Sequence, residues 1–135
     1  MLVLDGVGDL LVGMPERTLH TVRDSEKVGQ AVSSMKEHGI SQLPVLDDEG
    51  GLAGIVTETD VLTALFDDRC TMDTVVAEVM CRQVSTVSTF DDATRLAEVF
   101  LRGEVAIVVD ENNQLKTLLS KLDLIEHLSR SGVRH

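Results

Sequence analysis

An internal repeat occupies most of this chain of 135 residues. Two short apolar runs separated by an acidic, glycine-rich turn fill residues 43–60, and the same order returns at 106–123 around a polar turn. Upstream, the apolar pattern at 7–11 is matched at 76–80. A repeat on this scale dictates the architecture, because each copy forms the same supersecondary unit and cannot bury its apolar face alone. We therefore expect two copies of one unit, with shorter loops in the second.

Each copy predicts the same order of elements. A short helix, around residues 6–12 and again 74–80, precedes a small strand, and a helix with apolar residues at i, i+3, i+4 and i+7 follows. Two apolar strands joined by a tight turn and a last amphipathic helix complete the copy. Asp24 or Ser25 is the expected N-cap of the first striped helix, and Gly39 its expected stop. The stripes are Val28, Ala31, Val32 and Met35 in the first copy and Ala93, Leu96, Ala97 and Phe100 in the second.

The expected fold class is α/β (α+β), with two repeats at 6–68 and 72–131. Each is a small, mainly antiparallel three-stranded sheet with flanking helices, and the two pack with pseudo-two-fold symmetry. One copy of about 60 residues buries too little apolar surface to be stable alone, so the copies should share one interface. Hydrophobic residues make up 43% of the chain, with three Phe and no Tyr or Trp, so the core must be aliphatic.

Charge and composition exclude several classes of function. The net charge of −11 repels phosphate backbones, and the near absence of aromatic rings removes a platform for base stacking, so we expect no nucleic-acid partner. No apolar run approaches the roughly 20 residues that span a bilayer, so we expect no membrane association. No signal peptide is visible at the start of the sequence, which favours a cytoplasmic protein.

The sequence also lacks the patterns of a catalytic or metal centre. Cys70 and Cys81 are too few and too far apart for a zinc knuckle or a redox pair. The four His stand in no metal-binding pattern, and no nucleophile elbow or Walker loop is present. We therefore expect a protein that is not an enzyme and holds no metal and no covalently bound cofactor.

Two hydroxyl–carboxylate pairs carry the chemical signal. Thr57-x-x-Asp60 and Ser120-x-x-Asp123 each stand where a strand passes into a helix. Such a pair is typical of a capping box, in which the hydroxyl and the carboxylate satisfy free backbone N–H groups. The same geometry also suits a ligand, because a helix N-terminus and a hydroxyl bind phosphate or ribose oxygens and a carboxylate accepts from ribose hydroxyls. Spacing alone leaves both interpretations open.

The motif resembles a known family. The strand–turn–strand that ends in G-hydrophobic-hydrophobic-T-x-x-D resembles a CBS domain, and two in tandem resemble a Bateman module over residues 6 to 131. The second copy departs at Thr117, where the family usually has Gly, and has Ser120 for the commoner Thr. The shorter loop after Phe100 and the closing segment resemble the C-terminal regulatory module of cystathionine β-synthase.

The resemblance implies two ligand clefts. The first would combine Ser120 and Asp123 at the ribose, Ile40, Ser41 and Gln42 near the base, and Thr18, Leu19 and His20 from the entering strand. The second would combine Thr57, Asp60, Gln83, Val84, Ser85, Glu104, Val105 and Ala106. The motif favours the second cleft, and the likeness to cystathionine β-synthase favours the first.

The resemblance further implies a regulatory module that binds S-adenosylmethionine, AMP, ADP or ATP. Residues 1–67 hold 4 basic and 12 acidic side chains, a field that favours a cationic ligand such as S-adenosylmethionine. Few cations stand near the motifs to hold a phosphate tail: Lys121, Arg17 and Arg102.

The module is expected to form a homodimer and to control an attached or partner enzyme, for which cystathionine β-synthase is the first candidate. The alternatives are a structural dimerisation module without a ligand and a stand-alone protein that senses AMP or ATP.

Overall fold

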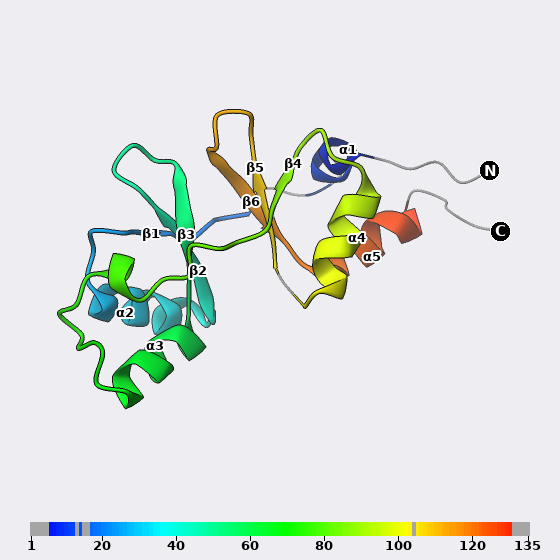
Figure 1. The fold of residues 1–135 in the computed structure, drawn as a ribbon. Helices are drawn as coiled ribbons and strands as arrows, with labels where there is room; N and C mark the ends of the chain where they lie inside the picture. The colour runs from blue at the N-terminus through cyan, green and yellow to red at the C-terminus, as the bar shows by residue number, and fades with distance from the viewer. Residues whose placement is uncertain (1–5, 13, 15–16, 104, 131–135) are drawn as a thin grey trace. The chain divides into compact units, whose positions relative to one another are not determined.

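The computed structural model describes residues 6–12, 14, 17–103 and 105–130 (Figure 1). The chain divides into two compact units. We call His20–Val84 the middle unit, and residues up to Leu19 together with those from Ser85 onward the terminal unit.

The middle unit is a three-stranded sheet with two helices on one side (Figure 1). The strand order is β1-β2-β3, with β1 parallel to β2 and β2 antiparallel to β3. This sheet is mainly antiparallel, as predicted. Its elements are β1 (Val22–Arg23), α2 (Val28–His38), β2 (Gln42–Leu46), β3 (Leu52–Thr57), α3 (Glu58–Phe66) and the 3₁₀ helix η1 (Val76–Glu78).

The terminal unit repeats this topology. Its strand order is β4-β5-β6, again with a parallel first pair and an antiparallel hairpin. The two copies of one supersecondary unit are therefore confirmed. The elements are α1 (Val7–Val12), β4 (Thr86–Ser88), α4 (Ala93–Leu101), β5 (Ala106–Val109), β6 (Leu115–Leu119) and α5 (Lys121–Arg130).

Each unit has its own core under the striped helix, and apart from Phe100 in the terminal unit no described aromatic side chain belongs to either core. The i, i+3, i+7 positions of α2 are buried as the periodicity predicts, and the hairpin strands supply the facing side chains. The core of the middle unit comprises Val22, Val28, Ala31, Met35, Leu43, Val45, Val56, Val61, Val76 and Met80. The core of the terminal unit comprises Val7, Leu10, Val87, Leu96, Val99, Phe100, Ala106, Val108, Leu119 and Leu124.

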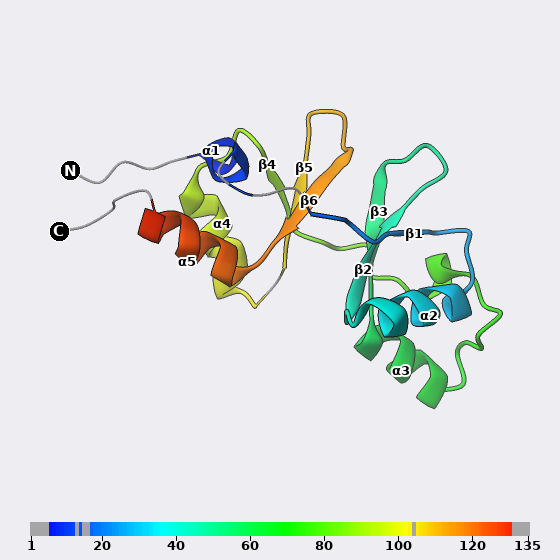
Figure 2. The same ribbon diagram turned by 180° about the vertical axis from the view of Figure 1, so that it is seen from behind.

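The leading helices are exchanged between the copies. The helix α1 opens the sequence, yet it packs into the core of the terminal unit, where both views place it beside α4 (Figures 1 and 2). The N–H of Val7 donates to the carbonyl of Asp91 at 2.7 Å. The helix η1 is held in the middle unit in the same way, with the N–H of Val76 donating to the carbonyl of Glu26 at 2.7 Å. The compact units are therefore not the two contiguous stretches of the repeat.

The ends of α2 test the predicted caps. Gly39 ends the helix in the left-handed conformation at φ 64°, as predicted. The N-cap prediction is wrong, because α2 begins at Val28 with Lys27 as its N-cap. Residues 24–26 instead form a turn, in which the Asp24 N–H donates to the carbonyl of Leu46 at 2.9 Å.

Candidate functional site

The Thr57–Asp60 pair joins β3 to α3 in the middle unit. Thr57 has extended backbone and is the N-cap of α3. The Thr57 hydroxyl donates to Oδ2 of Asp60 at 2.9 Å and accepts from the Asp60 N–H at 3.1 Å, while the Thr57 N–H donates to the same Oδ2 at 3.0 Å. The predicted capping box is therefore formed. It uses one carboxylate oxygen, and among the described residues no donor contacts the other, Oδ1.

The Ser120–Asp123 pair joins β6 to α5 in the terminal unit. The Ser120 N–H donates to Oδ2 of Asp123 at 2.8 Å, and the Asp123 N–H donates to the Ser120 hydroxyl at 3.2 Å. Both halves of a capping box are present here too. The two copies thus build the same junction from Thr-x-x-Asp and Ser-x-x-Asp.

One cation distinguishes the two junctions. Arg17, which follows α1 in the chain, donates from Nη2 to Oδ1 of Asp123 at 3.0 Å and from Nη1 to Oδ2 at 3.2 Å. Burial raises the pKa of Asp123, but the hydrogen bond and charge of Arg17 and the hydrogen bonds of Ser120 together lower it below its ordinary value. Asp123 is therefore ionised at neutral pH, with both oxygens occupied.

The first residues of each hairpin lie beside the pair of their own unit. Gln42 stands opposite Thr57 in the β2–β3 register, and the carbonyl of Ser41 accepts from the Glu58 N–H at 2.9 Å. In the terminal unit Ala106 stands opposite Leu119, the residue before Ser120. The predicted clefts associate these hairpin residues with the pair of the other unit, and that association stays a prediction.

Residues 18–20 were expected on the entering strand, but β1 begins only at Val22, so they belong to the extended connection that precedes it. This connection reaches the Ser120–Asp123 pair through Arg17. Thr18 and Leu19 come directly after Arg17, and Thr18 is exposed. His20 belongs to the middle unit, where its ring stacks on His38 with ring centroids 3.6 Å apart.

The remaining residues of the second predicted cleft lie on two connections. The carbonyl of Gln83 accepts from the Cys81 thiol at 3.5 Å, and the hydroxyl of Ser85 accepts from Arg102 at 3.1 Å. Val84 and Val105 are half-buried, and Ile40 of the first cleft is half-buried as well. Glu104 lies outside the described residues.

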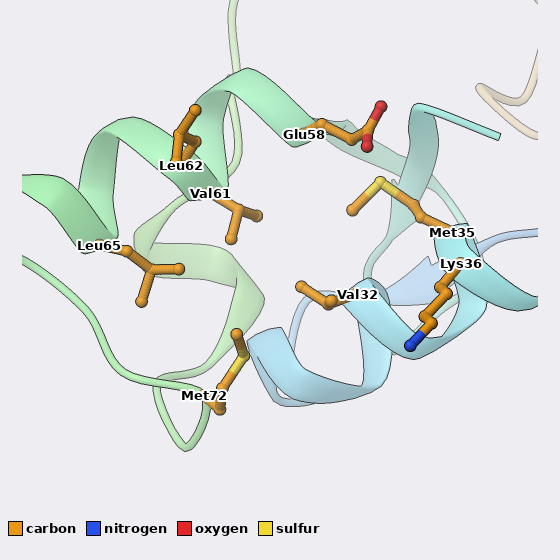
Figure 3. A pocket seen from close by; sticks show the side chains of 8 residues that line it. All are labelled: Val32, Met35, Lys36, Glu58, Val61, Leu62, Leu65 and Met72. Carbon is orange, nitrogen blue, oxygen red and sulfur yellow. The ribbon is translucent and has the colours of Figure 1, made fainter. Parts of the chain in front are cut away.

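An apolar groove lies between α2 and α3, and none of the residues that line it is a predicted site residue. Its volume is about 400 Å³, and side chains from both helices point into it (Figure 3). Lys36 and Glu58 stand among otherwise apolar side chains. Val32 and Met35, two positions of the apolar stripe on α2, line this groove. The lining residues are Val32, Met35, Lys36, Glu58, Val61, Leu62, Leu65 and Met72.

None of the helices described is both long and apolar enough to cross a membrane. In the same part of the chain, His, Cys, Asp and Glu side chains form no group suited to a metal ion.

Fold and motif together define the class of protein: a tandem of two βαββα units, each with a hydroxyl–carboxylate pair after its hairpin. The family model of the CBS domain matches residues 7–67 and 76–130. The chain belongs to the CBS-domain family and carries two copies of the domain.

Solved structures of CBS-domain proteins share this fold. The structure of CBSX2 in complex with AMP superposes with a TM-score of 0.78 at 25% identity, covering 94% of this chain and 98% of that one. The CBS domain pair of MJ0100 in complex with 5′-methylthioadenosine and S-adenosyl-L-methionine superposes with a TM-score of 0.73 at 21% identity, covering 96% and 99%.

Longer curated proteins contain a similar segment. An inosine-5′-monophosphate dehydrogenase of Methanocaldococcus jannaschii is 29% identical over 106 residues, which are 78% of this chain and 21% of that protein. Cystathionine β-synthase of Saccharomyces cerevisiae is 28% identical over 98 residues, 73% of this chain and 19% of the enzyme. This chain thus spans about a fifth of the length of these two relatives.

Proposed function

We propose that the chain is a regulatory, non-catalytic module that binds an adenosyl ligand and conveys its concentration to an attached or partner enzyme. The observation that carries the proposal is the repeated hydroxyl–carboxylate pair at a strand-to-helix junction. The ligand is S-adenosylmethionine or an adenine nucleotide. Similar CBS-domain structures contain AMP, or 5′-methylthioadenosine and S-adenosyl-L-methionine, and thereby support this ligand class.

The chemistry of the Thr57–Asp60 pair suits a ribose. Oδ1 of Asp60 accepts from no described residue, so it can take a hydrogen bond from a ribose hydroxyl without breaking the cap. Asp60 is half-buried, which strengthens a charge-assisted hydrogen bond relative to one in water. The capping role and the ligand role therefore use different oxygens of one carboxylate.

Titration of the chain with S-adenosylmethionine, AMP, ADP and ATP tests the proposal. We expect at least one of them to bind with saturation in calorimetry and to raise the melting temperature. Asp60→Ala and Asp123→Ala should each weaken binding at its own cleft by about tenfold or more, because each removes an acceptor for the ribose.

Asp92→Ala is the matched control for these variants. Asp92 caps α4 by accepting from the N–H groups of Thr94 and Arg95, but it belongs to neither pair. Its loss should lower stability by about 1 kcal/mol, as loss of an N-cap does, and leave affinity unchanged. A wild-type chain that binds none of the four ligands at millimolar concentration would contradict the proposal and favour a purely structural dimerisation module.

We also infer that two copies of the chain associate through the groove between α2 and α3. The groove is apolar, Leu62 is 65% exposed and Phe66 85% exposed, so a partner would remove a large apolar area from water. Lys36 and Glu58 both line the groove and carry opposite charges. In a two-fold dimer, Lys36 of one copy can pair with Glu58 of the other.

Sedimentation at micromolar concentration tests the dimer with one pair of variants. The wild-type chain should sediment as a dimer and Leu62→Asp as a monomer, because a carboxylate cannot be buried there unpaired. Thr63→Asp places the same charge on the next, also exposed, residue of α3 and should remain dimeric. A monomeric wild-type chain would refute this association.

The regulated enzyme is proposed from the relatives. An inosine-5′-monophosphate dehydrogenase and a cystathionine β-synthase each contain a segment similar to this chain, within a much longer protein. These relatives agree with a module that regulates an attached or partner enzyme. Cystathionine β-synthase is the candidate that the sequence favours.

A further inference from the structure

The carboxylates of the two proposed ribose sites differ in their hydrogen-bond partners. Asp60 offers Oδ1 to a ligand, whereas both oxygens of Asp123 accept from the guanidinium of Arg17, at 3.0 and 3.2 Å. The side chain of Asp123 is 13% exposed and that of Arg17 40% exposed. Oδ2 of Asp123 already accepts from Arg17 and from the Ser120 N–H, so a ribose that uses both carboxylate oxygens must displace Arg17, and one that uses the second lone pair of Oδ1 must lie against its guanidinium.

Displacement is feasible because the ion pair is partly exposed. Ion pairs in contact with water contribute little net stability, since both groups regain hydration when they separate. Once displaced, however, Arg17 remains within reach of the site as a free cation. The phosphate of a nucleotide would give Arg17 a new partner in place of Asp123. S-adenosylmethionine has one carboxylate but also a sulfonium and an ammonium group, so its net positive charge is repelled by the same guanidinium.

We propose that Arg17 sets the specificity of the Ser120–Asp123 site, so that it selects adenosyl ligands with a phosphate tail over S-adenosylmethionine. The inference rests on the proposed function and deepens it by naming the ligand class of one site. The Thr57–Asp60 site has no described cation on its carboxylate and lacks this selection.

The local cation opposes the preference expected from overall charge. The acidic field of the first repeat favours a cationic ligand, but exposed charges beyond about 10 Å are largely screened at physiological ionic strength. Arg17 is in direct contact with the carboxylate that would hold the ribose. At this site the nearby positive charge of Arg17 therefore determines which ligand is preferred, and the distant acidic residues do not.

Calorimetry with AMP, adenosine and S-adenosylmethionine tests the proposal in an Asp60→Ala background, which isolates the Ser120–Asp123 site. Arg17→Gln should weaken AMP roughly 10- to 100-fold, the range for loss of a charged hydrogen-bond pair. Adenosine, which has no phosphate, should bind as well as before or better, because Asp123 is no longer occupied. S-adenosylmethionine should bind more tightly. Arg17→Lys, which keeps the charge, should retain most of the preference for AMP over adenosine.

Arg130→Gln is the matched control, since it removes an exposed arginine of the same unit that pairs with Glu126. It should leave all three affinities unchanged. An affinity ratio of AMP to adenosine that is the same with and without Arg17 overturns the specificity proposal while leaving the ligand function intact. So does an Asp60→Ala chain that binds none of the probes while the wild-type chain binds them. Failure of the wild-type chain to bind any probe overturns the proposed function itself.

Discussion

Gly54→Ala is expected to lower the free energy of unfolding by about 2–3 kcal/mol, the upper part of the range for overpacking a filled site. A Cβ atom on Gly54 would overlap the carbonyl oxygen of Cys81 and come within 3.2 Å of its carbonyl carbon. That carbonyl cannot retreat freely, because it accepts from the Ile55 N–H at 2.9 Å while the Cys81 N–H donates back at 2.8 Å. Relief of the overlap requires breaking this backbone pair.

Urea unfolding measures the loss, with Gly6→Ala as the matched control. A Cβ atom on Gly6 would have its nearest heavy atom at 3.5 Å, an ordinary contact, so the control should unfold within about 1 kcal/mol of the wild-type chain. If Gly54→Ala is as stable as Gly6→Ala, close backbone approach is not the reason for glycine at this place in the motif.

The same position in the second copy shows how far a motif alone can be interpreted. Thr117 stands where the family usually has Gly, and this departure questions a close backbone approach at that place. Thr117 is buried in β6 with its hydroxyl donating to the Leu118 carbonyl at 3.3 Å. Over the described residues, no backbone bridge like that of Ile55 and Cys81 accompanies β6.

Local chemistry of the site could be predicted from the sequence because its partners are close in the chain. The Thr57–Asp60 and Ser120–Asp123 contacts join residues three apart, a spacing that fixes their geometry at a helix start. The ion pair of Arg17 and Asp123 joins residues 106 apart. The sequence indicated Arg17 only as a cation near the entering strand, since no spacing rule links it to that carboxylate.

The repeat and the helix stripes were likewise sufficient to predict the sheets and their helices, but they could not assign the leading helices. An apolar pattern at 7–11 predicts that one face of a short helix is buried, but it does not indicate in which of the two similar cores. Hydrogen bonds from Val7 and Gly8 to the carbonyls of Asp91 and Thr89 join α1 to the terminal unit, and these partners are far away in sequence. The contacts of η1 in the middle unit mirror them.

Leu10→Ala is therefore expected to destabilise the terminal unit and to spare the sheet that follows α1 directly in sequence. Leu10 is 1% exposed in the terminal core, and truncation of such a buried leucine removes about 2–5 kcal/mol. Native-state hydrogen exchange should show lower protection in β4, β5 and β6, with β1, β2 and β3 changed less.

Val76→Ala provides the reciprocal measurement, because Val76 is fully buried in the core of the middle unit. It should lower protection in β1, β2 and β3 first. If Leu10→Ala instead loosens β1, β2 and β3 more than β4, β5 and β6, then α1 packs in the core of the middle unit, and its assignment to the terminal unit is wrong. If both variants loosen both sheets equally, the units unfold together, and each core then depends on the other as the small size of one copy predicts.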